Sequence, residues 1–158
     1  MTRPVKKPSV YIASPLGFSK ENVRYLVRVR HRITELGLDY FDPWLLDYRS
    51  DIKQLGNPGS KGFSKAQEAL ATKIGTNNRE AISRSDYLLA ICDGPQVDDG
   101  TASEIGFAAG IGVKVHGLRT DFRNVGDLPA LPINLQVLYF IKCTGGQLFR
   151  SVEAIVIR

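Results

Sequence analysis

The chain has 158 residues, of which 43% are hydrophobic and 23% are charged. These values are ordinary for one globular domain and exclude a disordered or fibrous protein. The net charge of +5 is too small a bias to indicate a nucleic-acid polymer as partner. No apolar run approaches 18 residues, so we expect no transmembrane helix, and the basic N-terminus lacks the apolar segment of a secretory signal. We therefore expect a flexible basic tail at residues 1–8 and a single domain at residues 9–158.

The cysteines and histidines form no pattern that binds a metal. Cys92 and Cys143 lie far apart in apolar runs, neither belongs to a CxxC motif, and His31 and His116 are isolated. A metal site or a disulfide framework is therefore not expected. The pattern favours two reduced, buried thiols in a cytoplasmic protein.

Short apolar runs rich in strand-forming residues alternate with longer segments of helical periodicity. In chain order the pattern predicts a strand at 10–13, a helix at 20–36, a strand at 38–41, a long loop at 42–63, one or two helices between 64 and 85, a strand at 87–92, a helix at 101–111, strands at 113–118 and 138–142, and a helix at 147–155. Gly37 suits the left-handed position after the first helix, and Ser64 has the spacing of a capping box.

This alternation predicts an α/β fold, Rossmann-like, with a five-stranded parallel sheet and helices on both faces. In such folds ligands bind beyond the carboxyl ends of the strands, where the strand order reverses. The segments that directly follow strands are therefore the ones to examine for chemistry: residues 14–18, 42–44, 93–104 and 119–124.

The first two of these segments contain glycine and aromatic residues. Gly17 permits a tight turn that brings backbone close to a ligand, but no GxGxxG or P-loop motif is present, so we expect no dinucleotide cofactor. Trp44, the only tryptophan, follows the second strand and could form the wall of a site for a flat aromatic ligand, together with Phe18.

The segment at 93–106 is the richest in functional groups, because it holds three aspartates and a glutamate after the most apolar strand. Carboxylates this dense can act as acid, base or nucleophile. The spacing of Thr101 and Glu104 is also that of a capping box, in which the glutamate binds the backbone. Asp98 could equally belong to a solvated turn, Asp86 could end a helix, and Tyr11 could simply be a core residue.

At this point the residues resemble a known family, the nucleoside 2-deoxyribosyltransferases. Val-Tyr-Ile-Ala-Ser-Pro-Leu at 10–16 is similar to their opening motif, and Asp-Asp-Gly-Thr-Ala-Ser-Glu-Ile-Gly at 98–106 to their central signature. Residues 119–123 and 134–135 resemble segments found later in sequences of this family, so the resemblance spans about residues 10–146. It implies a flavodoxin-like domain, assembled into homodimers or homohexamers, that exchanges the base of a 2′-deoxynucleoside with a free nucleobase in a ping-pong reaction.

The resemblance also implies roles for individual residues. Glu104 would be the nucleophile that attacks C1′ of the deoxyribose, and Tyr11 would orient it. Asp98 would hold the sugar hydroxyls, chiefly the 5′-OH. Asp86 would face the nucleobase and handle its proton. Asn134 would reach into the site of a neighbouring subunit. The remaining candidate substrate-binding residues are Gly17, Phe18, Trp44 and Gly100.

Three alternatives remain at the level of sequence. A relative that hydrolyses nucleoside 5′-monophosphates must bind a phosphate, which Asp98 and Asp99 would repel. A non-catalytic nucleotide-binding module could use the same fold. A third alternative is nucleic-acid binding through the basic helix face of Arg24, Arg28 and Arg32, although such a face is most simply a solvated surface.

Overall fold

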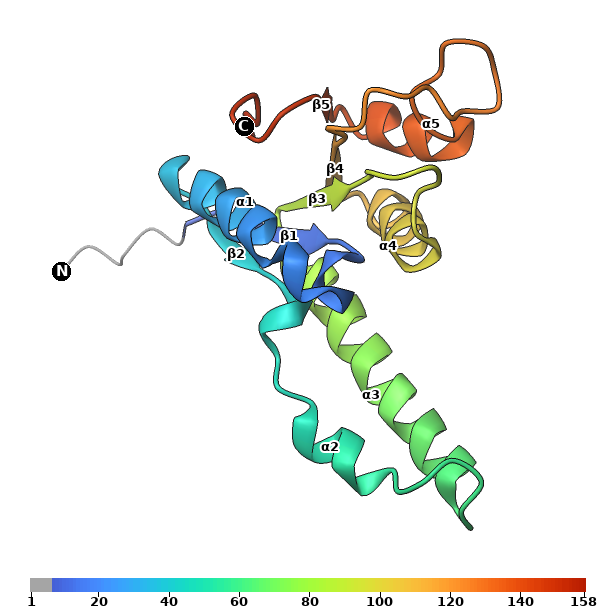
Figure 1. Cartoon of the computed structure of the whole chain (residues 1–158). Coiled ribbons are helices and arrows are strands. Elements are labelled where there is room, and N and C mark those ends of the chain that lie inside the picture. The colour runs from blue at the N-terminus through green and yellow to red at the C-terminus, as the bar shows by residue number, and fades with distance from the viewer. Residues whose placement is uncertain (1–6) are drawn as a thin grey trace, which may run out of the picture.

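The computed structural model describes residues 7–158, and residues 1–6 of the expected tail lie outside this range (Figure 1). Its centre is a five-stranded sheet in which every paired strand is parallel, in the order β2-β1-β3-β4-β5. The strands are β1 (Ser9–Ala13), β2 (Asp39–Phe41), β3 (Tyr87–Ile91), β4 (Lys114–Leu118) and β5 (Leu148–Phe149). This is the flavodoxin-like order, which confirms the predicted fold class.

Five α-helices connect and cover the strands. They are α1 (Val23–Glu35), α2 (Arg49–Gln54), α3 (Phe63–Arg84), α4 (Asp99–Gly110) and α5 (Leu135–Cys143). The short α2 lies inside the segment 42–63 that was predicted to be a loop, and residues 64–84 belong to one helix. Ser64 does not cap α3, because the helix begins one residue earlier, after Gly62 in the left-handed conformation (φ 86°).

Each face of the sheet carries its own apolar core, because successive side chains of a strand point to opposite faces. On one face Tyr11, Leu88 and Val115 pack against α3, α4 and α5 through side chains such as Ile82, Ile105 and Ile141. On the other face Ile12, Leu89 and Leu118 pack against α1 and the C-terminal segment through Leu26, Val29, Ile33, Val152 and Ile155. The second face therefore has one helix and an irregular segment as its cover.

The last two predicted elements are wrong. The apolar run at 138–142, predicted as a strand, lies inside α5, and the segment 147–155, predicted as a helix, contains β5 followed by turns. A short apolar run fits either a strand or a buried helix, so its periodicity cannot distinguish between the two. Asn134 caps the start of α5. Gly145 (φ 77°) ends it, donating from its amide to the Lys142 carbonyl at 3.0 Å.

The two glycines at 145–146 therefore end a helix, where the sequence suggested that they precede one. A Cβ atom on Gly146 would lie 1.6 Å from the Val115 carbonyl oxygen, so only glycine allows the chain to pass this close to β4. Cys143, at the end of α5, is exposed, so the prediction of two buried thiols is correct for Cys92 alone.

The helix α2 and the first half of α3 extend away from the sheet, at the end of the molecule remote from α5 (Figure 1). Lys73 of α3 forms an ion pair with Asp51 of α2 at 2.7 Å, which ties the two helices together. None of the helices in residues 7–158 is both long enough and apolar enough to cross a membrane.

Candidate active site

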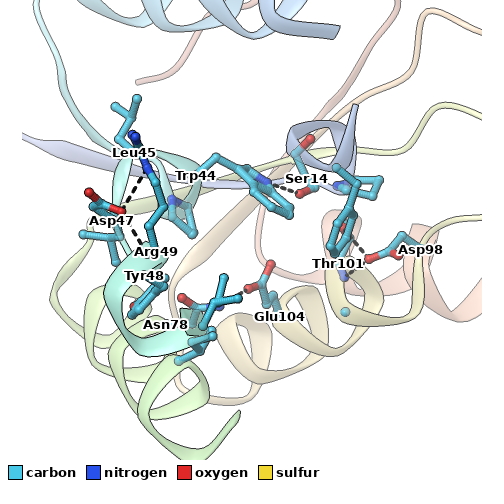
Figure 2. Close-up of a pocket in the computed structure, with 17 residues that line it drawn as sticks. Ser14, Trp44, Leu45, Asp47, Tyr48, Arg49, Asn78, Asp98, Thr101 and Glu104 are labelled. Atoms are coloured by element: carbon cyan, nitrogen blue, oxygen red, sulfur yellow. Dashed lines mark hydrogen bonds and ion pairs between the residues drawn. The ribbon is translucent and has the colours of Figure 1, made fainter. Parts of the chain in front are cut away.

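A cavity of about 720 Å³ opens at the carboxyl ends of β1 and β2 (Figure 2). Its wall comes from four segments: the turn after β1, the segment from Pro43 through the start of α2, the middle of α3, and the first turns of α4. In the order β2-β1-β3 the chain changes direction between β1 and β3, and this is the point where doubly wound sheets bind ligands.

Glu104 lies in the cavity on the second turn of α4, and its carboxylate is held from one side only. Its Oε1 atom accepts a hydrogen bond of 2.6 Å from the hydroxyl of Tyr11 and one of 3.3 Å from Nδ2 of Asn78. Oε2 makes no hydrogen bond with any residue in the described range. The capping-box alternative is thus wrong, because α4 is capped by Asp98, and Glu104 turns toward β1.

Burial dominates the electrostatics of this carboxylate. It raises the pKa of Glu104, the charge of Asp98 raises it further, and the hydrogen bonds from Tyr11 and Asn78 partly oppose the rise. Burial and the neighbouring Glu104 also hold the pKa of Tyr11 far above its ordinary value, so its hydroxyl stays protonated and remains a donor. Once ionised, Glu104 is a poorly solvated carboxylate with one unoccupied oxygen, as a nucleophile requires.

Asp98 has a structural role and also faces the cavity. Its Oδ2 accepts from the Thr101 amide at 2.9 Å and from the Thr101 hydroxyl at 3.2 Å, which caps α4. Its Oδ1 makes no hydrogen bond with the described residues, so one oxygen is left for a ligand. Gly100 lines the same wall, and a Cβ atom there would lie 3.2 Å from the Asp98 carboxylate.

An aromatic pair forms the opposite wall. The indole Nε1 of Trp44 donates to the Ser14 carbonyl at 2.7 Å, and the ring of Phe18 meets it edge-on with centroids 4.5 Å apart. Gly17 is necessary for this arrangement, because a Cβ atom there would lie 1.9 Å from the Trp44 ring. Asp42 fixes the backbone by accepting from the Trp44 amide at 3.0 Å.

Two predicted site residues, Asp86 and Asn134, lie away from this cavity, whereas Tyr11 and Gly17 adjoin residues that line it. Asp86 is at the amino end of β3, where its carboxylate accepts from the Ser9 amide at 2.8 Å, so it lies at the opposite edge of the sheet. The nucleobase contact predicted for Asp86 does not fit this position. Asn134 caps α5, and its amide group donates to Asp127 at 3.0 Å, outside the cavity of its own chain.

Sequence reasoning missed several polar residues that line the cavity, among them Asn78 and Tyr48. Asn78 lies on α3, and its Oδ1 is buried without a hydrogen-bond partner. Adjacent asparagines are unfavourable inside a helix, so the pair at 77–78 was a signal that something other than helix propensity determines the residues there. Tyr48 carried no such signal, because its position depends on how α2 docks.

A buried arginine organises the loops beside the cavity. Arg119, which follows β4, is fully buried and donates to the carbonyls of Cys92, Gly94 and Arg123. It thereby fastens the segment after β3 to the segment after β4 and fixes the approach to α4. In the described part of the chain, no group of three or more His, Cys, Asp or Glu side chains is arranged to hold a metal ion.

Several solved structures share this fold. A conserved protein from Enterococcus faecalis V583 is 28% identical, with a TM-score of 0.65 and 94% of each chain covered. A 2-desoxiribosyltransferase from Leishmania mexicana is 24% identical, with a TM-score of 0.63 and 93% of each chain covered. A 2-deoxyribosyltransferase from Bacillus psychrosaccharolyticus is 23% identical, with a TM-score of 0.61 and coverages of 94% and 93%.

The comparison with curated proteins finds no match. The model of one family, described as nucleoside 2-deoxyribosyltransferase, matches residues 10–136. This range contains β1 to β4, all four segments of the cavity wall and Glu104 itself. The chain therefore belongs to the nucleoside 2-deoxyribosyltransferase family of glycosyl-transferring enzymes.

Proposed function

We propose that this protein exchanges the nucleobase of 2′-deoxynucleosides by a ping-pong reaction through a deoxyribosyl intermediate on Glu104. The observation that carries the proposal is the Glu104 carboxylate, which the Tyr11 hydroxyl holds by Oε1 at 2.6 Å inside a cavity of about 720 Å³. The substrates are then a deoxynucleoside and a free base. The reaction requires no metal ion or cofactor, because the carboxylate itself supplies the nucleophile.

The chemistry follows that of retaining glycosidases. The bond between C1′ and the base nitrogen breaks through an oxocarbenium-like state, whose positive charge a nearby carboxylate stabilises. Since Tyr11 and Asn78 both bind Oε1, Oε2 of Glu104 is the oxygen free to form the bond to C1′. A second base then attacks the intermediate, and attack by water instead gives hydrolysis.

The polar wall and the aromatic wall of the cavity contact different parts of the substrate. Asp98 caps the start of the helix that carries Glu104, and its free Oδ1 can accept a hydrogen bond from a sugar hydroxyl. The Trp44 and Phe18 rings offer flat apolar surface to a base. We assign the polar base contact to Asn78, in place of Asp86, because its unpaired Oδ1 can accept a hydrogen bond from an exocyclic or ring N–H.

We also infer that the protein acts as a homo-oligomer, a dimer or a hexamer, in which Asn134 serves the site of a neighbouring subunit. Exposed apolar side chains surround the start of α5, among them Leu128, Leu135 and Tyr139. Sedimentation analysis of the purified protein tests this inference. A monomer at the concentrations where exchange is observed would contradict it.

The deciding experiment is incubation of the protein with deoxyinosine and a different free base. A new deoxynucleoside is expected, together with its loss in Glu104→Ala. Free deoxyribose without exchange would indicate a hydrolase, and no reaction would indicate a binding module. The alternative function is hydrolysis of a nucleoside 5′-monophosphate, and a CMP N-glycosidase of Clostridium botulinum is a structural neighbour with 13% sequence identity. Turnover of deoxyinosine 5′-monophosphate, compared with that of deoxyinosine, tests this alternative. Faster turnover of the monophosphate would contradict the preference for free nucleosides.

A further inference from the structure

The departing base carries negative charge at its nitrogen and leaves faster when a proton donor reaches it. Most donors in the cavity are already engaged. The Tyr11 hydroxyl and Asn78 Nδ2 both donate to Glu104, and the Thr101 hydroxyl donates to Asp98. The Trp44 indole donates to a backbone carbonyl. The acid that serves the base must be a group whose proton is still free.

Tyr48 has such a proton. Its hydroxyl oxygen accepts a hydrogen bond of 2.9 Å from Asn77 Nδ2, and its own proton has no acceptor among the described residues. The side chain lines the cavity, and Figure 2 shows it beside Asn78, on the side of Glu104 away from Asp98. Tyr48 is therefore on the base side of the nucleophile and away from the candidate sugar ligand.

The other free donors are poorer acids. Ser14 also lines the cavity, and its hydroxyl accepts from the Leu16 amide at 3.0 Å, but an alkyl hydroxyl is a far weaker acid than a phenol. Arg49 is an exposed guanidinium paired with Asp47 at 3.2 Å, and a guanidinium does not give up its proton in proteins. Among the residues that line the cavity, the Tyr48 phenol is therefore the best proton donor for the departing base.

The tyrosine is also held in place from α3. Asn77 binds its oxygen, and the Lys73 ammonium lies 5.8 Å from the centre of its ring. Lys73 in turn pairs with Asp51 at 2.7 Å. A side chain just before the short helix α2 is thus held by two groups of α3, one of which is itself paired with α2, and positioned acid catalysis requires such a fixed geometry.

We propose that Tyr48 is the general acid and base for the nucleobase, an inference that rests on the proposed base exchange. In the first half-reaction the C1′–N bond breaks with its electron pair moving to the base, the C1′–Oε2 bond to Glu104 forms, and the Tyr48 proton moves to the departing base. In the second half the nitrogen of the incoming base attacks C1′, the C1′–Oε2 bond breaks with its electron pair returning to Glu104, and the proton of that nitrogen moves to the Tyr48 oxygen. Over one complete exchange Tyr48 loses one proton and regains one.

The test is the dependence of the first half-reaction on the leaving group. Single-turnover release of base is measured for a series of 2′-deoxynucleosides whose free bases differ in acidity, with wild type, Tyr48→Phe and Asn77→Ala. Tyr48→Phe keeps the ring and removes only the hydroxyl. We expect it to slow the poorest leaving groups about 100-fold, at the lower end of general acid effects. The most acidic bases should leave less than about threefold more slowly, because they need no proton.

Asn77→Ala should show the same pattern with a smaller loss, because it frees the hydroxyl from its anchor without removing it. Tyr40→Phe is the matched control, since Tyr40 is a half-exposed tyrosine of β2 outside the cavity, and it should leave all rates unchanged. Equal slowing of every substrate by Tyr48→Phe, or none, would overturn the proposal while leaving base exchange intact. A wild type that releases no base would instead overturn the proposed function.

Discussion

Removing the Tyr11 hydroxyl should shift the pH dependence of the reaction. In Tyr11→Phe the ring keeps its stacking on Phe41, with centroids 5.7 Å apart, but Glu104 loses its shorter hydrogen bond, 2.6 Å long. This bond favours the ionised carboxylate and so works against burial, which raises the pKa of Glu104. Its loss therefore raises that pKa further.

The size of the shift follows from the strength of the bond. A hydrogen bond to a charged group contributes about 1.5–3 kcal/mol, and one pKa unit corresponds to about 1.36 kcal/mol. The pKa of Glu104 should thus rise by about 1–2 units. Because Glu104 must be ionised to act as the proposed nucleophile, activity on the acid side falls, and the acid limb moves to higher pH by the same 1–2 units.

The assay is kcat/KM for base exchange measured against pH, since this ratio reports the ionisation of the free enzyme. Asn78→Ala provides the comparison. Its bond to the same Oε1 atom is longer, 3.3 Å, so its shift should be smaller than that of Tyr11→Phe. An acid limb that stays in place while the plateau falls would refute the reasoning, because Tyr11 would then act on the transition state without controlling the ionisation of Glu104.

Three further predictions follow from the packing. Gly17→Ala should displace Trp44 and destabilise the fold by about 1–3 kcal/mol in urea unfolding, whereas Gly75→Ala, with open space around its Cβ position, should not destabilise it. Burial lowers the pKa of His116 from 6.5 to about 4. The free energy of unfolding should therefore be highest above pH 6.5 and fall by up to about 3 kcal/mol as the pH drops toward 4, because the unfolded chain takes up the proton first. A His116→Asn variant that shows the same loss of stability would contradict this explanation. Asp98→Ala should cost about 0.5–2 kcal/mol as a lost cap, and Asp98→Asn, which keeps the cap, should raise KM at unchanged stability if the carboxylate binds sugar.

The sheet was largely predictable because its strands are covered on both faces. The run at 87–92 is nearly continuous in apolar residues, as buried parallel strands are, and it is the central strand β3. Gly37 adopts the left-handed conformation (φ 78°) after α1, as predicted from its place in the chain. Here the local pattern and the tertiary packing favour the same structure.

The C-terminal third was not predictable in the same way. The run at 138–142 is apolar because α5 packs on the sheet, and five apolar residues carry no period that separates a helix from a strand. The edge strand β5 has only two residues, Leu148–Phe149, and is defined by its pairing with β4. A strand this short has no sequence signature of its own.

The central signature placed Glu104 and Asp98 correctly at the cavity, because both belong to one short segment that opens a helix after a strand. Spacing could not say which of them caps the helix. The nucleobase contact that the family resemblance implied for Asp86 does not fit the structure, since a residue before a strand lies at the amino edge of the sheet and the ligand edge is the other one.

The sequence by itself determined the alternation of strands and helices from β1 to β4, except for α2, together with the parallel sheet and the acidic segment that opens α4, because these depend on composition and period along a few consecutive residues. Only the tertiary structure decided which groups surround Glu104. Tyr11 of β1 and Asn78 of α3 meet at Glu104, and Tyr48 of the segment before α2 lines the same cavity, because packing brings together residues distant in the chain. No local pattern encodes such a meeting, since each contact depends on how two elements dock.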